Sequence, residues 1–184
     1  MLFRSPGESD LDVDSTLKTK NYSPQEMVRS AEDFYVSLGM DRLPDTFWTR
    51  SQFTKPRDRE VVCHASAWGL DGGKDLRIKM CIKQTYDELR VVYHELGHNY
   101  YQAAYKDQPP LFQGSAHSGF HEAIGDTVTL SMTPDYLQEV GLVNSSEISD
   151  KAIINRQMQM ALDKIAFLPF GKLIDEWRWG VFSG

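Results

Sequence analysis

The stretch VVYHELGHNYYQ, residues 91–102, constrains the fold of this chain more than any other. It lies within TYDELRVVYHELGHNYYQAAY, where Thr85 begins the pattern of a capping box and predicts a helix of about five turns. His94 and His98 are four residues apart, so a helix projects both imidazoles from one face, where they can bind one metal ion. Glu95 lies about 100° further round the helix and is suited to act as a general base. For this motif alone, an ordinary half-exposed helix is an equally good interpretation.

A second motif supplies what the first one lacks. A catalytic zinc ion takes three protein ligands and keeps one position open, so two histidines require a third ligand from elsewhere. The segment GFHEAIGD offers Glu122 on a separate predicted helix. Asp126 follows one helical turn later and can accept the second N–H of a ligand histidine, which fixes the tautomer of that histidine. Together the two motifs favour a zinc site with the ligands His94, His98 and Glu122.

Two further histidines flank Glu122 in the sequence. Ser118 is expected to cap the helix that carries Glu122. Because the ligand set is already complete, we interpret His117 as a loop residue and His121 as a helix-surface residue.

The two cysteines lie in segments that read as paired strands. REVVCHASAW and DLRIKMCIK flank GLDGGKD, whose Asp-Gly-Gly is a hairpin turn signal. A hairpin centred on Gly72 places Cys63 and Cys81 opposite each other, at a Cβ separation that a disulfide can bridge, about 3.5 to 5.5 Å. A disulfide would favour an oxidising compartment. The alternative is two reduced cysteines packed as small hydrophobic residues.

The segment CHASAW has two interpretations of its own. If it forms an edge strand, its free N–H and C=O groups can hold an extended peptide by strand addition. The alternative is a hairpin without such a role, in which His64 is satisfied locally. The spacing alone favours this second interpretation.

The rest of the chain is expected to be mainly α-helical. We expect an irregular N-terminal segment at 1–20, a β-hairpin at 60–84, zinc-binding helices at 85–132 and further helices at 133–184. Before the hairpin, Ser23 and Pro24 mark the start of a helix that ends near Gly39, and a loop with two prolines follows. In the last segment, Pro169 is expected to stop a long helix.

Composition and charge exclude several classes of function. The net charge is -6 and the pI is near 5.3, and no cluster of Lys and Arg occurs, so nucleic acid and anionic membranes are not expected partners. No apolar run approaches the roughly 20 residues of a transmembrane helix. The first residues show no recognisable signal peptide.

Seven blocks of the sequence, taken in order, resemble one known family. They are CHASAW, DLRIKMC, HELGH, YKDQPPLF, GFHEAIGD, ALDKIAFLPFG and WRWGVFSG. In this order they resemble the angiotensin-converting enzyme family of zinc peptidyl dipeptidases, which are gluzincin metallopeptidases. The segments SQFTKPRDREVVCHASAW and KDQPPLFQGSAH are more similar to bacterial members than to vertebrate ones.

The resemblance implies a role for several residues of the motifs. The zinc ligands of the family match His94, His98 and Glu122, its catalytic base matches Glu95, and the aspartate that orients a ligand histidine matches Asp126. The paired cysteines of the family match Cys63 and Cys81, which strengthens the predicted disulfide.

The resemblance also implies how substrate binds. In the family, the segment that matches His64, Ala65, Ser66 and Ala67 lines the substrate groove and bonds to the peptide, which reverses the interpretation of His64 given above. The positions that match Asp163 and Phe167 help to shape the pocket for the last side chain of the substrate.

Family domains are several times longer and form two helical halves around a deep groove. The resemblance therefore implies that residues 1–184 are a partial peptidase domain, the zinc-binding core of a larger two-lobed helical metallopeptidase. The family's groups that stabilise the tetrahedral intermediate or hold the C-terminal carboxylate of the substrate are expected beyond Gly184. Most of its chloride-binding arginines are expected there too.

The implied function is that of a zinc-dependent peptidyl-dipeptidase. Such an enzyme releases C-terminal dipeptides from oligopeptides that have a free C-terminus. Its cofactor is Zn2+, chloride is a further ion of the full-length enzyme, and its location is extracytoplasmic. The alternative is an inactive zinc-binding fragment or pseudo-enzyme that serves as a binding module.

Overall fold

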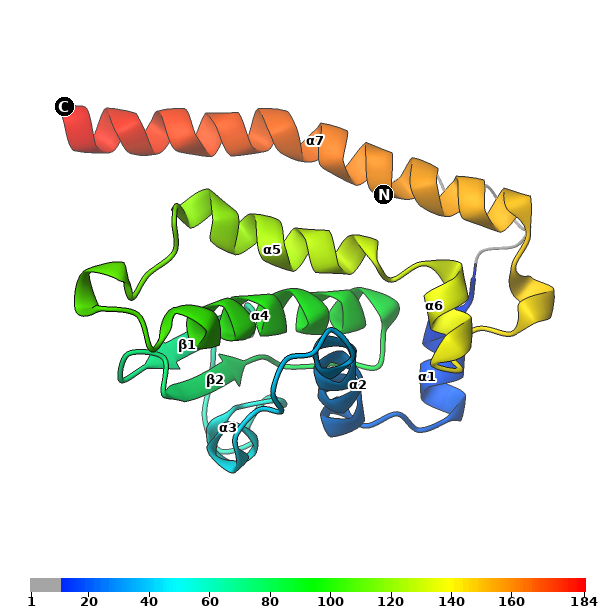
Figure 1. Cartoon of the computed structure of the whole chain (residues 1–184). Helices are drawn as coiled ribbons and strands as arrows, with labels where there is room; N and C mark the ends of the chain where they lie inside the picture. The colour runs from blue at the N-terminus through cyan, green and yellow to red at the C-terminus, as the bar shows by residue number, and fades with distance from the viewer. Residues whose placement is uncertain (1–10) are drawn as a thin grey trace. The chain divides into compact units, whose positions relative to one another are not determined.

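The computed structural model describes residues 11–184, and the chain divides into two compact units (Figure 1). One unit is Asp12–Leu142, and the other contains Val143–Gly184. The described residues are mainly helical and contain one antiparallel pair of strands, which confirms the predicted fold class.

The unit Asp12–Leu142 holds most of the secondary structure. Its helices are α1 (Val13–Thr19), α2 (Pro24–Ser37), α3 (Asp45–Arg50), α4 (Tyr86–Tyr105), α5 (Ser118–Leu130) and α6 (Pro134–Glu139), with a 3-10 turn η1 (Pro110–Phe112). Its strands are β1 (Ser66–Leu70) and β2 (Asp75–Lys79). The second unit contains a 3-10 turn η2 (Ser145–Glu147) and one long helix, α7 (Asp150–Ser183).

Two short helices lie where the sequence predicts irregular structure. The side chain of Asp12 accepts a hydrogen bond from the Ser15 N–H and caps α1, which buries Val13 and Leu17 on one face. The expected irregular segment at 1–20 is therefore wrong from Asp12 onward, and residues 1–10 lie outside the described part. The helix α3 occupies part of the expected proline loop and buries Phe47. Both helices are shorter than the span over which an apolar period can be recognised.

The β-hairpin has a different centre and shorter strands than predicted. Leu70 pairs with Asp75, so the hairpin is centred between Gly72 and Gly73 and not on Gly72. The reason is a four-residue turn in which Asp71 and both glycines have positive φ and the Gly73 N–H donates to the Leu70 carbonyl. The strand β1 begins only at Ser66.

The helix α4 is the centre of the first unit. Its N-cap is Thr85, as predicted, and its buried side includes Leu89, Val92 and Leu96. It packs against α5, α2 and both strands. Figure 1 shows it lying between the hairpin and α5.

The helices α4 and α5 approach each other through two glycines. A Cβ atom on Gly97 would lie 3.0 Å from the Cα atom of Gly125 and 3.0 Å from the hydroxyl of Tyr35. A Cβ atom on Gly125 would lie 2.6 Å from Nδ1 of His94. The distance at Gly125 is shorter than real Cβ atoms show, and those at Gly97 are tighter than almost all real Cβ contacts, so the close approach of the two helices favours glycine at both positions.

The helix α7 continues through Pro169, and the predicted break at this residue is wrong. A proline inside a helix removes one backbone hydrogen bond and costs about 3 kcal/mol. Long helical runs stand on both sides of Pro169, so the bonds that they form offset the lost one. None of the helices in the part that the structure describes is long and apolar enough to cross a bilayer.

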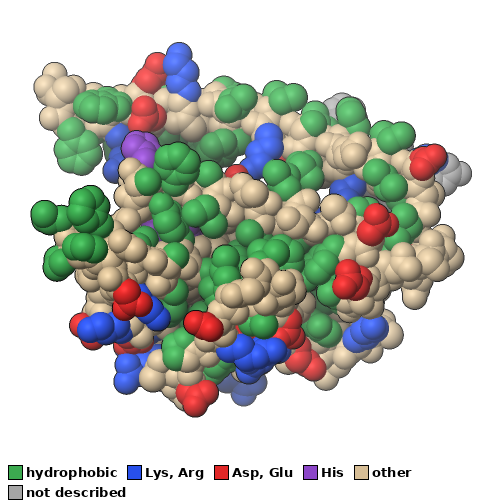
Figure 2. Space-filling model, viewed as in Figure 1, with side chains coloured by type: hydrophobic (Ala, Val, Ile, Leu, Met, Phe, Trp, Pro, Cys, Tyr) green, Lys and Arg blue, Asp and Glu red, His purple; other side chains and the backbone are tan. Residues whose placement is uncertain are grey.

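Many hydrophobic side chains of α7 are exposed, and Figure 2 shows some of them on the face in view. Ile165, Phe167, Leu168 and Phe170 project in different directions because successive helix positions differ by about 100°. A helix that is apolar all round is normally covered on all sides.

The crossing of α4 and α5 predicts an unusual effect of Gly97→Ala. Alanine ordinarily stabilises a helix by about 1 kcal/mol relative to glycine. Here the added methyl group would displace α5, so we expect a net loss of about 1–3 kcal/mol in the free energy of unfolding. Urea denaturation measures this loss. The matched control is Gly180→Ala in α7, where a Cβ atom meets nothing within 4 Å. Equal stabilisation by both substitutions would contradict the predicted close contact.

The exposed apolar surface of α7 predicts self-association. Apolar patches larger than a few hundred Å² promote contact between molecules. We expect residues 1–184, expressed alone, to show a mass that rises with concentration in size-exclusion chromatography with light scattering. A shorter chain that ends at Leu142 is the control and should associate less. A monomer at every concentration would contradict the prediction.

Candidate metal centre

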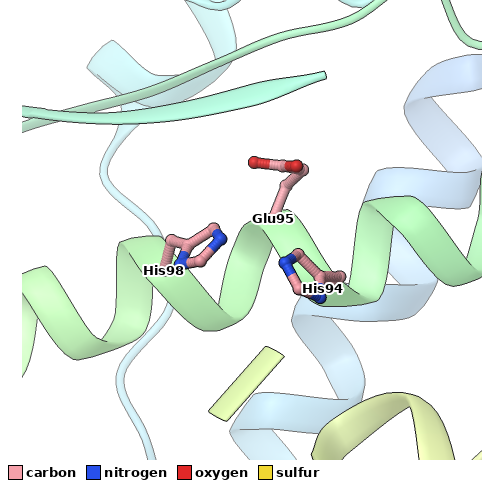
Figure 3. Close-up of side chains that lie close together, drawn as sticks. All are labelled: His94, Glu95 and His98. Atoms are coloured by element: carbon pink, nitrogen blue, oxygen red, sulfur yellow. The ribbon is translucent and has the colours of Figure 1, made fainter. Parts of the chain in front are cut away.

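Two imidazoles on consecutive turns of α4 form the base of the candidate metal centre. The ring centroids of His94 and His98 are 4.8 Å apart, and their planes are inclined by 81° (Figure 3). Both side chains are largely buried, with 18% and 13% of their surface exposed. Figure 3 shows the two rings next to each other along the helix.

A carboxylate from α5 faces both rings. One oxygen of Glu122 is 3.2 Å from Nε2 of His94, and its other oxygen is 3.7 Å from Nε2 of His98. The same ring atom of each histidine therefore faces one carboxylate. Two imidazole nitrogens and one carboxylate oxygen are a common ligand set of catalytic zinc.

A second carboxylate, that of Glu95, also lies near the two rings. One of its oxygens and the ligand nitrogens of His94 and His98 all lie within 4.8 Å of one another. Glu95 is buried, and Figure 3 shows it projecting from a different side of α4 than the two histidines. Because Glu122 contacts both Nε2 atoms, the geometry favours Glu122 as the third ligand and leaves Glu95 beside the ligand set.

The surroundings shift the pKa values of two groups in the centre. Burial raises the pKa of Glu95, and the charge of Glu122 raises it further, while His94 and His64 act in the opposite direction. A carboxylate with a raised pKa is a stronger base than an exposed one. Burial also lowers the pKa of His98 and so favours its neutral form. The neutral imidazole is the form that binds a metal ion.

The second nitrogen of His94 has an acidic partner. The Nδ1 atom of His94 lies 3.3 Å from a carboxylate oxygen of Asp126, one turn after Glu122 on α5. The close approach at Gly125 is what permits this contact, since any side chain there would collide with the His94 ring.

Of the two remaining histidines of this region, His117 is an exposed residue just before α5, as predicted, and His121 lies on α5. Nδ1 of His117 accepts a hydrogen bond from the Gly119 N–H, so His117 and not Ser118 is the N-cap of α5. His121 is half-buried, and its Nδ1 atom lies 3.2 Å from Nδ1 of His98. The interpretation of His121 as a helix-surface residue is therefore wrong. Sequence reasoning missed this contact because it depends on the direction from which α5 approaches α4.

The hairpin is held next to the metal centre by a buried amide. The side-chain N–H groups of Asn99 donate to the carbonyls of Trp68 on β1 and Arg77 on β2, at 3.3 and 3.2 Å. Asn99 is fully buried. Sequence reasoning did not select Asn99, and only its position directly after His98 could have suggested a role.

The predicted substrate segment runs into β1. His64 and Ala65 precede the strand, and Ser66 and Ala67 are its first two residues. His64 is exposed and lies near enough to Glu95 to offset a small part of the rise in pKa of that carboxyl group. Within the described chain, β1 pairs only with β2, so no further strand bonds to its outer edge.

A disulfide joins Cys63 to Cys81, with the Cα atoms 5.2 Å apart, which confirms the predicted pairing. It closes the hairpin beyond the paired region, since both cysteines lie outside β1 and β2. It therefore holds the segment that starts with His64 close to the end of β2.

Two predicted substrate residues, Asp163 and Phe167, lie on α7 in the other unit. Asp163 accepts a hydrogen bond from the Gln159 side chain, and Phe167 packs near Phe170. Their expected role in substrate binding stays a prediction.

The whole chain, residues 1–184, matches the family model described as angiotensin-converting enzyme. It is 50% identical to angiotensin-converting enzyme of Oryctolagus cuniculus and 49% identical to that of Sus scrofa, over 100% of this chain and 14% of each relative. It is 43% identical to angiotensin-converting enzyme of Theromyzon tessulatum, over 100% of this chain and 30% of that relative. The chain thus spans less than a third of the length of these relatives. The expected closer likeness to bacterial members stays a prediction. On the match over its full length, the chain belongs to the angiotensin-converting enzyme family.

Proposed function

We propose that this chain carries the zinc-binding and proton-transfer groups of a zinc-dependent peptidyl-dipeptidase. One observation carries the proposal: Nε2 of His94 and Nε2 of His98 both face the carboxylate of Glu122. Membership of the angiotensin-converting enzyme family supports it independently. The relatives bear the name of an enzyme that this chain covers only in part, so the activity is a proposal for the protein in its full length.

The residues present fit a zinc ion. Two neutral imidazoles and a carboxylate are the ligand set of several catalytic zinc sites, and magnesium or calcium would require mainly oxygen ligands. The two histidines are held by the helix, and Asp126 contacts the Nδ1 atom of His94. His94, His98 and Glu122 would therefore hold the ion.

Glu95 is the proposed general base. Bound zinc would polarise the scissile carbonyl group and acidify a water molecule. Glu95 would take a proton from the attacking water and then deliver it to the nitrogen of the leaving dipeptide. Its burial and its raised pKa suit both steps, because a group that must accept and then donate a proton works best with a pKa near the working pH.

The substrate would lie along the open edge of β1. An extended peptide can add to an edge strand through backbone hydrogen bonds. The backbone groups of Ala67 are suited to this, because those of its partner Ile78 bond to Ser51 and Gln52 on the far side of β2 and leave the groups of Ala67 facing away from β2. His64 lies at the start of this edge and near Glu95, so it could orient the peptide next to the base. We further propose that Asp163 and Phe167 contribute to the pocket for the last side chain of the substrate, whose free C-terminus would be bound elsewhere in the full-length protein.

An extracytoplasmic location follows from the same proposal. The Cys63–Cys81 disulfide supports it, because structural disulfides persist mainly in oxidising compartments. A chloride ion in the full-length enzyme stays a prediction that rests on the family resemblance alone.

Zinc affinity tests the proposed ligand set. Loss of a residue that only hydrogen-bonds to a metal ligand typically weakens metal binding by roughly 10- to 100-fold. Glu122→Gln removes a ligand itself and should weaken zinc binding by more than this. Asp126→Asn should fall within that range, because it alters only the partner of His94. Glu95→Gln is the matched control and should bind zinc almost as the unchanged protein does. Competition with a chromogenic chelator measures all three affinities. A loss in Glu95→Gln that exceeds the loss in Glu122→Gln would reverse the assignment of the two carboxylates.

Peptide hydrolysis tests the role of Glu95. In the full-length protein, Glu95→Gln should lower the rate of dipeptide release from a blocked tripeptide by about 10²- to 10⁴-fold, because the proton acceptor is lost. Zinc content, measured on the same samples, should be unchanged. Undiminished release by Glu95→Gln would refute the mechanism. Zinc binding without any release by the unchanged protein would favour the alternative, an inactive binding module.

A further inference from the structure

His121 stands in a short chain of side chains that ends on a proposed metal ligand. Its Nδ1 atom lies 3.2 Å from Nδ1 of His98, and its Nε2 atom lies 3.2 Å from the hydroxyl oxygen of Tyr105. The ring also packs against Tyr101, with ring centroids 4.8 Å apart. His121 is thus held from two sides and directed at the atom of His98 that does not face Glu122.

The two histidines of α4 have the same pattern of contacts. Each turns its Nε2 atom toward Glu122 and its Nδ1 atom toward another residue of α5. That residue is Asp126 for His94 and His121 for His98. Partners of this kind fix the tautomer and the orientation of a metal-binding imidazole.

The chemistry of imidazole determines where the protons of His98 and His121 must lie. A neutral imidazole has one N–H and one lone pair. If Nε2 of His98 binds zinc, the proton of His98 is on Nδ1, and it donates to the lone pair on Nδ1 of His121. The proton of His121 is then on Nε2, and it donates to the oxygen of Tyr105. This assignment gives His98 and His121 one tautomer each and makes the Tyr105 oxygen an acceptor.

We propose that His121 is a positioning residue for the metal ligand His98, with Tyr105 holding His121 in the required tautomer. The proposal rests on the zinc site proposed above. His121 is not itself a ligand, because its two nitrogens are directed at Nδ1 of His98 and at Tyr105 and not at Glu122.

Two substitutions of His121 separate a hydrogen bond from simple packing. His121→Phe keeps a ring among the tyrosines but removes both nitrogens. His121→Asn keeps an acceptor atom close to the place of Nδ1. In the full-length protein, we expect His121→Phe to weaken zinc binding by roughly 10- to 100-fold. His121→Asn should recover most of that loss. Chelator competition gives the affinities, and thermal unfolding of the zinc-free proteins reports their stability.

The hydroxyl of Tyr105 provides a second and gentler test. Tyr105→Phe removes one oxygen and should weaken zinc binding roughly two- to tenfold, the range expected for one neutral hydrogen bond. In a protein that already carries His121→Asn, adding Tyr105→Phe should weaken zinc binding no further, since asparagine has no Nε2 atom for Tyr105 to hold. This pair of measurements decides the question even if His121→Phe fails to fold.

The outcomes distinguish this inference from the proposed function. Zinc binding that is unaffected by Glu122→Gln would refute the zinc site itself. Zinc binding that requires Glu122 but is equally strong in His121→Phe would overturn the role of His121 alone. Equal losses in His121→Phe and His121→Asn, or an equal effect of Tyr105→Phe in both backgrounds, would also overturn it. Nitrogen chemical shifts of His98 in the zinc-loaded protein should show the proton on Nδ1. The opposite tautomer would contradict the proposed hydrogen bonds from His98 to His121 and from His121 to Tyr105.

Discussion

The close crossing of α4 and α5 is the constraint on which the proposed site depends. At this crossing Gly97 and Gly125 let α4 and α5 approach so closely that an added side chain would press on the facing helix. The residues of α5 on either side of Gly125 then reach the imidazoles of α4. The packing of two helices therefore sets the geometry of the candidate metal centre.

The helix α4 serves both the core and the site. One side of it is apolar and buried, and this burial holds the helix in place. Another side carries His94 and His98, and the buried Asn99 attaches the hairpin. Two of the three proposed metal ligands, the proposed base and the hairpin are thus all positioned by one rigid element, while Glu122 comes from α5. Sites built on helices and strands are held more firmly than sites built on loops.

Helices with caps and a long apolar period could be predicted from the sequence, and short elements could not. Ser23 and Thr85 cap α2 and α4 as expected. The helices α1 and α3 were missed, because six or seven residues contain too little of a period to recognise. The centre of the hairpin was misplaced, since it depends on the φ angles of Asp71 and two glycines. Pro169 did not stop α7, because local preference is a weak guide inside a long helix.

The spacing of His94, Glu95 and His98, together with Glu122 and Asp126, predicts a cluster of side chains, and the structure brings these side chains together. The two histidines meet because helical periodicity alone places residues four apart on one face. The zinc chemistry of the cluster stays a prediction. The spacing could not predict which residues of another helix would meet those imidazoles. His121 meets His98 only because α5 approaches α4 from a particular direction. In the same way, Asn99 bonds to both strands only because of the direction from which the hairpin approaches α4. Those directions are set by packing between elements distant in sequence, which a local pattern does not contain.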